Sequence, residues 1–228
     1  MQLCIALDLP TKEQNIALLN QIKEHNNLWI KVGFRSYIRD GKEFIKEIKE
    51  INSTFKIFLD LKLYDIPNTM ADASEEIAKL GVDMFNVHAS AGVKAMKTVM
   101  DRLKTLQNRP LVLAVTALTS FDNVSFRDIY KEDINTAAKK FAKDAYKANL
   151  DGVVCSAFES LDIKNATSKE FLTLTPGIRP FGEDANDQQR VATIDVAKEN
   201  LVDFIVVGRP IYKSSNPAKK VEEILRAL

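Results

Sequence analysis

Eight short apolar runs, each followed by a helical pattern, constrain the fold of this chain more than any other feature of its sequence. The runs recur roughly every 25 to 30 residues, which is the spacing of strand–helix units. They are continuous rather than alternating, as parallel strands covered on both faces require. We expect strands at residues 2–7, 28–32, 55–62, 84–88, 110–116, 152–155, 171–175 and 204–207.

These elements close most economically into a (β/α)8 TIM barrel, and we expect residues 1–228 to form a single α/β domain. A doubly wound open sheet is the alternative, but no G-x-G-x-x-G follows the first strand. A long polar segment up to residue 133 precedes the helix expected at 134–148. Helices are expected at 11–24, 40–50, 66–80, 91–106, 134–148, 158–165, 188–199 and from about 217.

Composition excludes several classes of partner. The net charge is +1, so no overall charge favours nucleic acid or an acidic membrane surface. No run is long enough to cross a membrane, and the N-terminus enters a strand without a signal-peptide pattern. Cys4 and Cys155 lie inside apolar runs, which predicts reduced core thiols in a cytoplasmic protein rather than a disulfide.

The end of the third strand concentrates charge. Asp60 and Lys62 are two positions apart, so an extended strand places them on one face, and Asp65 follows after a short turn. We therefore expect these three charges to converge at the C-terminal end of the strand. Pro67 suits the first turn of the helix that comes next. Most Asp-x-Lys pairs are surface ion pairs. Apolar residues on both sides of this one favour burial, and hence function.

Polar residues also stand at the other strand ends, where barrel active sites lie. Asp8 and Lys31 end the first two strands, although a helix cap and a solvated lysine are the alternatives. Gly208 and Arg209 follow the eighth strand and suit a phosphate, with an exposed Gly-Arg-Pro turn as the alternative. The remaining strand-end and loop residues are His88, expected to pack at the rim, and Thr119, Arg179 and Gln188.

The run Asp60-x-Lys62-x-x-Asp65-Ile66-Pro67-Asn68-Thr69 resembles the signature of the orotidine 5′-phosphate decarboxylase family. The resemblance extends over nearly the whole chain. The further matching pieces are Ala6-Leu7-Asp8, Lys31-Val32-Gly33, Leu118-Thr119-Ser120, Thr175-Pro176-Gly177-Ile178-Arg179, Asp187-Gln188-x-Arg190 and Gly208-Arg209-Pro210-Ile211.

This resemblance implies a homodimeric barrel that converts orotidine 5′-phosphate to uridine 5′-phosphate, the last step of UMP biosynthesis. Lys62 would protonate the pyrimidine in a charged set with Lys31, Asp60 and the partner's Asp65. The substrate contacts it implies are Asp8, Lys31 and Asp60, with Thr69 from across the interface, then Ile66, Thr119, Pro176, Arg179, Gln188, Gly208 and Arg209. No cofactor or metal is needed for this chemistry.

Two other functions stay open at this stage. A related barrel could be a Mg²⁺-dependent lyase or synthase acting on a sugar phosphate, but Lys31 stands where such barrels carry a metal-binding Glu. A catalytically idle phosphate-binding barrel is the second alternative. An idle barrel would be expected to have lost one of the charged residues Lys31, Asp60, Lys62 and Asp65, and all four are present.

Overall fold

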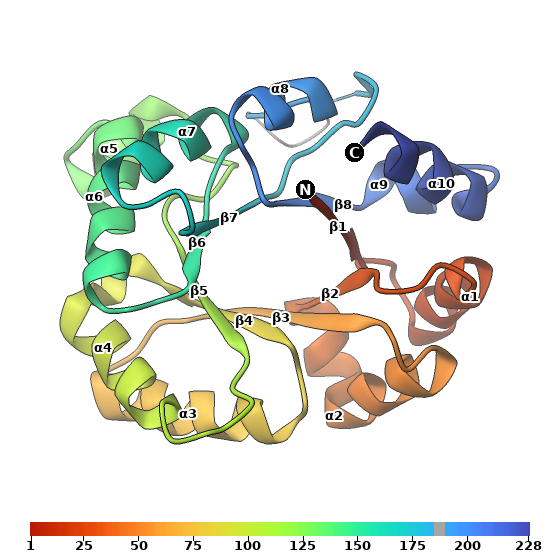
Figure 1. The fold of residues 1–228 in the computed structure, drawn as a ribbon, viewed down its shortest axis with the longest axis horizontal. Helices are drawn as coiled ribbons and strands as arrows, with labels where there is room; N and C mark the ends of the chain where they lie inside the picture. The colour runs from red at the N-terminus through yellow and green to blue at the C-terminus, as the bar shows by residue number, and fades with distance from the viewer. Residues whose placement is uncertain (185–189) are drawn as a thin grey trace.

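Eight parallel strands close into a barrel in the order in which they occur in the chain (Figure 1). The structure is a computed structural model and describes residues 1–184 and 190–228. The predicted barrel is confirmed, and the fourth and eighth strands have the expected bounds. The strands are β1 (Gln2–Ala6), β2 (Trp29–Gly33), β3 (Lys56–Leu63), β4 (Met84–His88), β5 (Leu111–Val115), β6 (Gly152–Val154), β7 (Leu172–Thr175) and β8 (Phe204–Val207).

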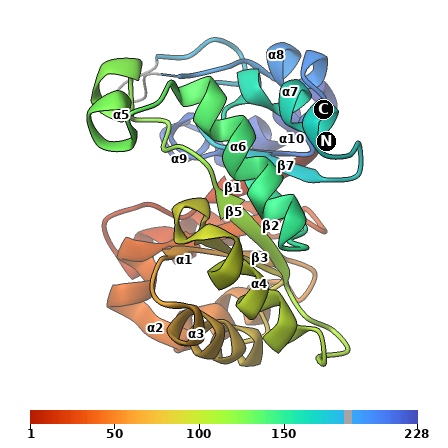
Figure 2. The same ribbon diagram turned by 90° about the vertical axis from the view of Figure 1, so that its left-hand side faces the viewer.

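Helices cover the outside of the barrel (Figures 1 and 2). Both termini lie at one end of the barrel, and α5 lies at the other (Figure 2). In the described part of the chain no helix is long and apolar enough to cross a membrane. The helices are α1 (Lys12–Ile22), α2 (Phe34–Ile51), α3 (Pro67–Lys79), η1 (Ala89–Ala91), α4 (Gly92–Leu103), α5 (Asn123–Tyr130), α6 (Ile134–Lys147), α7 (Ala157–Ala166), α8 (Ile194–Glu199), α9 (Arg209–Tyr212) and α10 (Pro217–Ala227).

Four helical segments differ from the prediction, namely α2, α5, α8 and α9. The described residues 190–193 of the helix expected at 188–199 precede α8, and α9 was not expected. The polar segment before residue 133 contains α5, a helix that the sequence did not predict. Its Phe126 is fully buried and stacks on Tyr130 with ring centroids 4.4 Å apart. One buried aromatic is a weak periodic signal in a polar stretch, so sequence periodicity does not reveal the helix. A further difference is α2, which begins at Phe34 and is kinked at Gly41, where φ is 62°.

Two separate apolar cores follow from the alternation of side chains along each strand. One set of side chains fills the barrel interior and includes Trp29, Phe58, Met84 and Phe204. The other set packs between the strands and the surrounding helices. Gly152 leaves room where β6 meets β7, because a Cβ there would come within 2.2 Å of the Leu172 carbonyl oxygen.

An aspartate precedes every second strand from β4 onward and fastens it to the strand before. Asp151 shows the pattern: its Oδ2 accepts the Val112 N–H at 2.8 Å, and its own N–H donates to the Val112 carbonyl at 3.0 Å. Arg109 adds a two-pronged ion pair at 2.7 and 2.8 Å. The equivalent pairings are Asp83 with Ile57 and Lys49, and Asp203 with Thr173 and Lys164.

The backbone conformation before each of these aspartates also repeats. The residue two positions before each aspartate has a positive φ, in the left-handed region; these residues are Gly81, Asn149 and Leu201. Asn27 is also left-handed just before β2, where Leu28 occupies the position of the aspartate and its carbonyl accepts the Lys56 N–H at 2.9 Å. The barrel therefore carries a two-strand repeat at its N-terminal end that sequence comparison within the chain does not reveal.

We predict that Asp151→Ala lowers the free energy of unfolding by about 2 to 3 kcal/mol, because a backbone N–H and the Arg109 guanidinium both lose a charged acceptor. Urea unfolding would measure this. The control is Asp101→Ala, whose carboxylate pairs with Lys97 on the surface of α4 and should matter by less than about 0.5 kcal/mol. Equal effects of the two substitutions would contradict the clamping role.

Candidate active site

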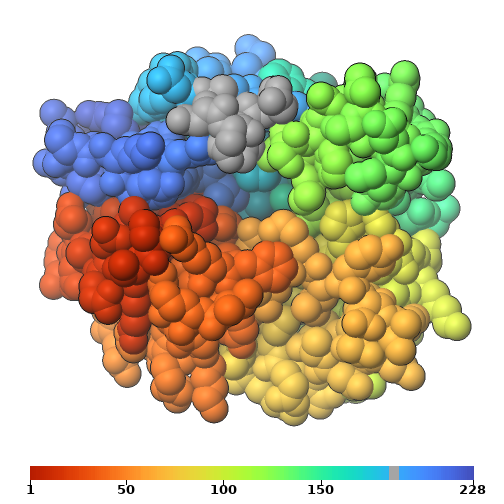
Figure 3. All heavy atoms as spheres, turned by 180° about the vertical axis from the view of Figure 1, so that it is seen from behind, coloured from red at the N-terminus to blue at the C-terminus, as the bar shows by residue number. Residues whose placement is uncertain are grey.

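A cavity of about 280 Å³ lies at the end of the barrel where the parallel strands finish. Figure 3 views the molecule from this end, with the first part of the chain lying against the last. The cavity unites strand ends that are far apart in sequence. Nine predicted site residues line it: Asp8, Lys31, Asp60, Lys62, Thr119, Pro176, Arg179, Gly208 and Arg209.

Four of these side chains form a row of alternating charge, which we call the charged row (Asp8, Lys31, Asp60 and Lys62). Lys31 Nζ lies 3.1 Å from Asp8 Oδ1 and 3.5 Å from Asp60 Oδ2. Lys62 Nζ donates to Asp60 Oδ1 at 2.6 Å. The side chains of Lys31 and Asp60 are 12% and 14% exposed, against 48% for Asp8. The centre of the charged row is therefore poorly hydrated.

Burial and charge act in opposite directions on the two central groups. Burial on its own would lower the pKa of Lys31, but attraction to Asp60 and Asp8 outweighs it and raises that pKa. Burial on its own would raise the pKa of Asp60, but Lys31 and Lys62, with hydrogen bonds from Lys62 and Asn86, lower it. Both groups are therefore ionised at neutral pH.

Strand alternation explains why charge faces the cavity. Trp29 and Phe58 point into the barrel interior, so Lys31 and Asp60, two positions further on, point the same way. Lys62 also reaches the cavity, but strand alternation does not place it there. Its φ is +50°, so the backbone is not extended at this residue. The predicted contact with Asp60 is confirmed, but a break in strand geometry brings it about.

Asn86 is a site residue that the sequence reading missed. It is fully buried on β4, its Oδ1 accepts the Lys62 backbone N–H at 2.7 Å, and its Nδ2 donates to Asp60 Oδ1 at 2.8 Å. The sequence could have indicated it, because Asn86 lies two residues after Met84 on the same strand and Met84 faces the barrel interior. Asn86 therefore belongs to the same inward tier as Lys31 and Asp60.

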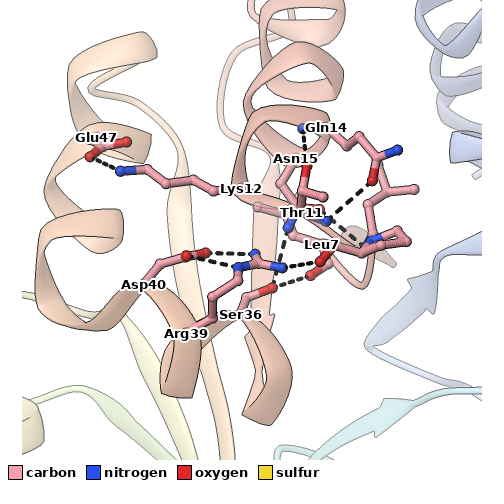
Figure 4. A network of polar contacts seen from close by, with 11 residues as sticks. Leu7, Thr11, Lys12, Gln14, Asn15, Ser36, Arg39, Asp40 and Glu47 are labelled. Carbon is pink, nitrogen blue, oxygen red and sulfur yellow. Dashed lines mark hydrogen bonds and ion pairs between the residues drawn. The ribbon is translucent and has the colours of Figure 1, made fainter.

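Polar side chains of α1 and α2 hold the loop that carries Asp8 (Figure 4). Ser36 Oγ donates to the Leu7 carbonyl at 2.8 Å, and Asn15 Nδ2 donates to Ser36 Oγ at 3.3 Å. The Leu9 N–H in turn donates to Asn15 Oδ1 at 3.3 Å. Both neighbours of Asp8 are thus tied to buried groups on α1 and α2. Thr11 caps α1, so Asp8 is not the helix cap.

The far side of the cavity carries guanidinium groups. Arg179 is 5% exposed, and its Nε and Nη1 donate to the carbonyls of Asp184 and Ile178 at 2.6 and 3.1 Å. Arg209 begins α9 directly after β8 and also lines the cavity. Gln188, the other residue predicted here, lies outside the described residues.

A largely buried ion pair that the sequence reading missed joins α7 to the chain that follows β7. Glu159 of α7 pairs with Arg190, whose Nη2 also approaches the Leu118 carbonyl at 3.5 Å. Burial raises the pKa of Glu159, and Arg190 opposes that rise. Through its contact with Leu118, Arg190 links the loop after β5, which carries Thr119, to the chain that follows β7.

Three predicted site residues lie away from the cavity of this chain. Asp65, Ile66 and Thr69 are exposed, and Asp65 Oδ1 accepts only the neighbouring Ile66 N–H, at 2.7 Å, among the contacts of the described residues. The expectation that Asp65 converges with Asp60 and Lys62 is therefore wrong within a single chain.

His88 packs at the rim, as predicted. Its ring stacks on Tyr64 with centroids 5.8 Å apart, and its Nδ1 accepts the Ser90 N–H at 3.2 Å. Burial, together with the nearby Lys62 ammonium, lowers the pKa of His88. The imidazole is therefore neutral at pH 7 and adds no charge to the site.

Comparisons with known proteins agree on one family. The model of the orotidine 5′-phosphate decarboxylase / HUMPS family matches residues 1–224. The chain is 67% identical over its whole length to the full orotidine 5′-phosphate decarboxylase of a Nitratiruptor species. It is 59% identical, again over the whole of both chains, to that of Campylobacter jejuni subsp. doylei.

A solved structure shares the fold. The crystal structure of orotidine 5′-phosphate decarboxylase from Lactobacillus acidophilus superposes with a TM-score of 0.87 at 34% identity, covering 99% of this chain and 98% of that one.

We predict that the Asp60 carboxylate stabilises the folded state in a pH-dependent way. Its pKa is lowered on folding, so its contribution is present above its ordinary pKa of about 3.9 and is lost as the pH falls through the lower folded value. Urea midpoints of the wild type and Asp60→Asn should therefore differ more at pH 7 than at pH 3. The same difference at both pH values would contradict the lowered pKa.

Proposed function

The chain belongs to the orotidine 5′-phosphate decarboxylase / HUMPS family, and from this premise we propose that it decarboxylates orotidine 5′-phosphate to uridine 5′-phosphate. The reaction is the last step of UMP biosynthesis. The observation that supports it most directly is the charged row: an ammonium group held by a carboxylate at the inner edge of the cavity.

The chemistry needs placed charge. Loss of CO₂ from C6 of the pyrimidine leaves a carbanion in the ring plane, with no adjacent π-system to take the electrons. The Lys62 ammonium stabilises this charge as it forms and then delivers the proton to C6. Opposite charges about 4 Å apart attract by about 4 kcal/mol at an effective dielectric near 20. Asp60 accepts a hydrogen bond from the Lys62 ammonium and so orients it for both tasks.

The rest of the cavity suits the rest of the nucleotide. Asp8 and Lys31 bind the ribose hydroxyls, while Thr119 and Pro176 contact the pyrimidine. Arg179, Gly208 and Arg209 take the phosphate, with Gln188 as a further contact outside the described residues. Binding energy from the phosphate, remote from C6, holds the pyrimidine against Lys62.

A second copy of the chain completes the site. Asp65, Ile66 and Thr69 are exposed and do not line the cavity of their own chain, and we assign them to the active site of the partner in a homodimer. Four exposed apolar side chains support this interface: Phe34 and Ile38 on α2, and Tyr64 and Ile66 in the segment after β3. The ring of Phe34 lies 5.6 Å from Lys62 Nζ, so one of these apolar side chains borders the reacting group.

The sugar-phosphate lyase alternative is less well supported by the same geometry. The Lys31 ammonium stands between the carboxylates of Asp8 and Asp60, where a divalent cation would need those oxygens. The proposed reaction needs no metal or organic cofactor, no nucleic acid and no membrane. Cys4 and Cys155 are buried free thiols, which supports a reducing, cytoplasmic location.

We predict that the purified protein lowers the absorbance of orotidine 5′-phosphate with a chelator present, and that Lys62→Ala lowers kcat/KM by more than about 1,000-fold. The control is Lys97→Ala on the surface of α4, which should retain wild-type turnover. Normal turnover by Lys62→Ala would remove the proposed proton donor. Activity that disappears with chelator would favour the metal-dependent alternative.

We predict that mixed dimers of two inactive variants regain activity. Lys62→Ala and Asp65→Ala chains, unfolded and refolded together in equal amounts, should recover about a quarter of wild-type turnover, because half the dimers are hybrids with one intact site each. The same chains refolded separately and then mixed serve as the control. Recovery that stays at the level of the separate variants would show that Asp65 acts within its own chain.

A further inference from the structure

The ladder between β3 and β4 is interrupted at the point where Lys62 enters the site. Leu59 pairs with Phe85, but the next pairing is Leu63 with Val87, so four steps along β3 face two along β4. Lys62 lies inside this gap with φ +50°. Its N–H bonds to the side-chain oxygen of Asn86 at 2.7 Å instead of to a strand carbonyl.

Three groups close a ring across this gap. The Lys62 N–H donates to Asn86 Oδ1, Asn86 Nδ2 donates to Asp60 Oδ1 at 2.8 Å, and the same Asp60 oxygen accepts from Lys62 Nζ at 2.6 Å. A backbone N–H can only donate, and an ionised carboxylate can only accept. The group between them must therefore accept on one side and donate on the other, as an amide does.

We infer that Asn86 is a positioning residue that sets the Lys62 ammonium against the reacting carbon, an inference that rests on the proposed decarboxylation. Asn86 does not line the cavity and is fully buried, so it acts through Lys62 and Asp60. It fixes both ends of the lysine, the backbone directly and the ammonium through the Asp60 oxygen. His88, the titratable residue of β4, stacks on Tyr64 and has its pKa lowered mainly by burial.

Two substitutions separate positioning from mere packing. Asn86→Ala removes both contacts and should lower kcat by about 100-fold at every pH, since small misplacements of a reacting group cost about that much. The KM for orotidine 5′-phosphate should change by less than about threefold, because the guanidinium groups lie across the cavity.

Asn86→Asp keeps the shape but opposes the Asp60 carboxylate with a second one. The two carboxylates share a proton at low pH, when a donor to Asp60 is restored, and lose it as the pH rises. Turnover of Asn86→Asp should therefore fall with rising pH through a range in which wild-type turnover is flat. A purely structural role would give no such slope.

The control for lost stability is Ser160→Ala, which breaks the buried hydrogen bond to Thr173 Oγ1 (2.8 Å). This bond lies in the half of the barrel remote from Lys62, so the variant should keep wild-type kcat.

A crystal structure of Asn86→Ala tests the geometry independently of turnover. We expect the Lys62 Nζ to lie more than about 4 Å from Asp60 there, beyond the reach of an ion pair.

Unchanged Lys62 geometry, or wild-type kcat in Asn86→Ala, would overturn the inference. A wild-type protein that turns over no orotidine 5′-phosphate would instead overturn the proposed function, and the crystal structure would still decide what Asn86 holds.

Discussion

Opposite charges packed where water has little access control the mouth of this barrel. Lys31 lies between two carboxylates, and Asp60 lies between two ammonium groups, so each central charge is satisfied from both sides. Removing one partner of such a buried set leaves a charge without compensation, which is costly. Each charge of the row therefore depends on its neighbours. Lys31 and Asp60 are ionised at neutral pH because of the opposite charges beside them rather than because of exposure to solvent.

The charged row depends on an apolar floor beneath it. Cys4, Trp29 and Phe58 fill the barrel interior one tier below Lys31 and Asp60. Burial raises the pKa of the Cys4 thiol, so the floor stays uncharged. The opposite end of the barrel uses charge differently, because its aspartates join neighbouring strands and accept backbone N–H groups. Stability is thus secured at one end, and the other is free to hold charges for chemistry.

Much of this was predictable from local sequence. Continuous apolar runs located the strands, and the strand-end rule brought Lys31, Asp60 and Arg179 to one cavity. Asn86 and Glu159 escaped prediction because a lone amide or carboxylate inside an apolar run has no pattern of its own. The helix α5 was missed because one buried aromatic, Phe126, organises it. The place of Asp65 cannot follow from one chain if its partner lies in another copy.

Lys62 shows why strand geometry alone does not make the site. Two residues of regular strand span about 6.6 Å, so an extended β3 would carry Lys62 that much further toward solvent than Asp60. The left-handed turn folds the chain back and costs about 1 to 2 kcal/mol for a residue with a Cβ. A buried hydrogen bond contributes about 1 kcal/mol, and one to a charged group contributes more. The Asn86 amide makes one of each, so its two bonds are enough to hold the backbone in the conformation that the ammonium needs.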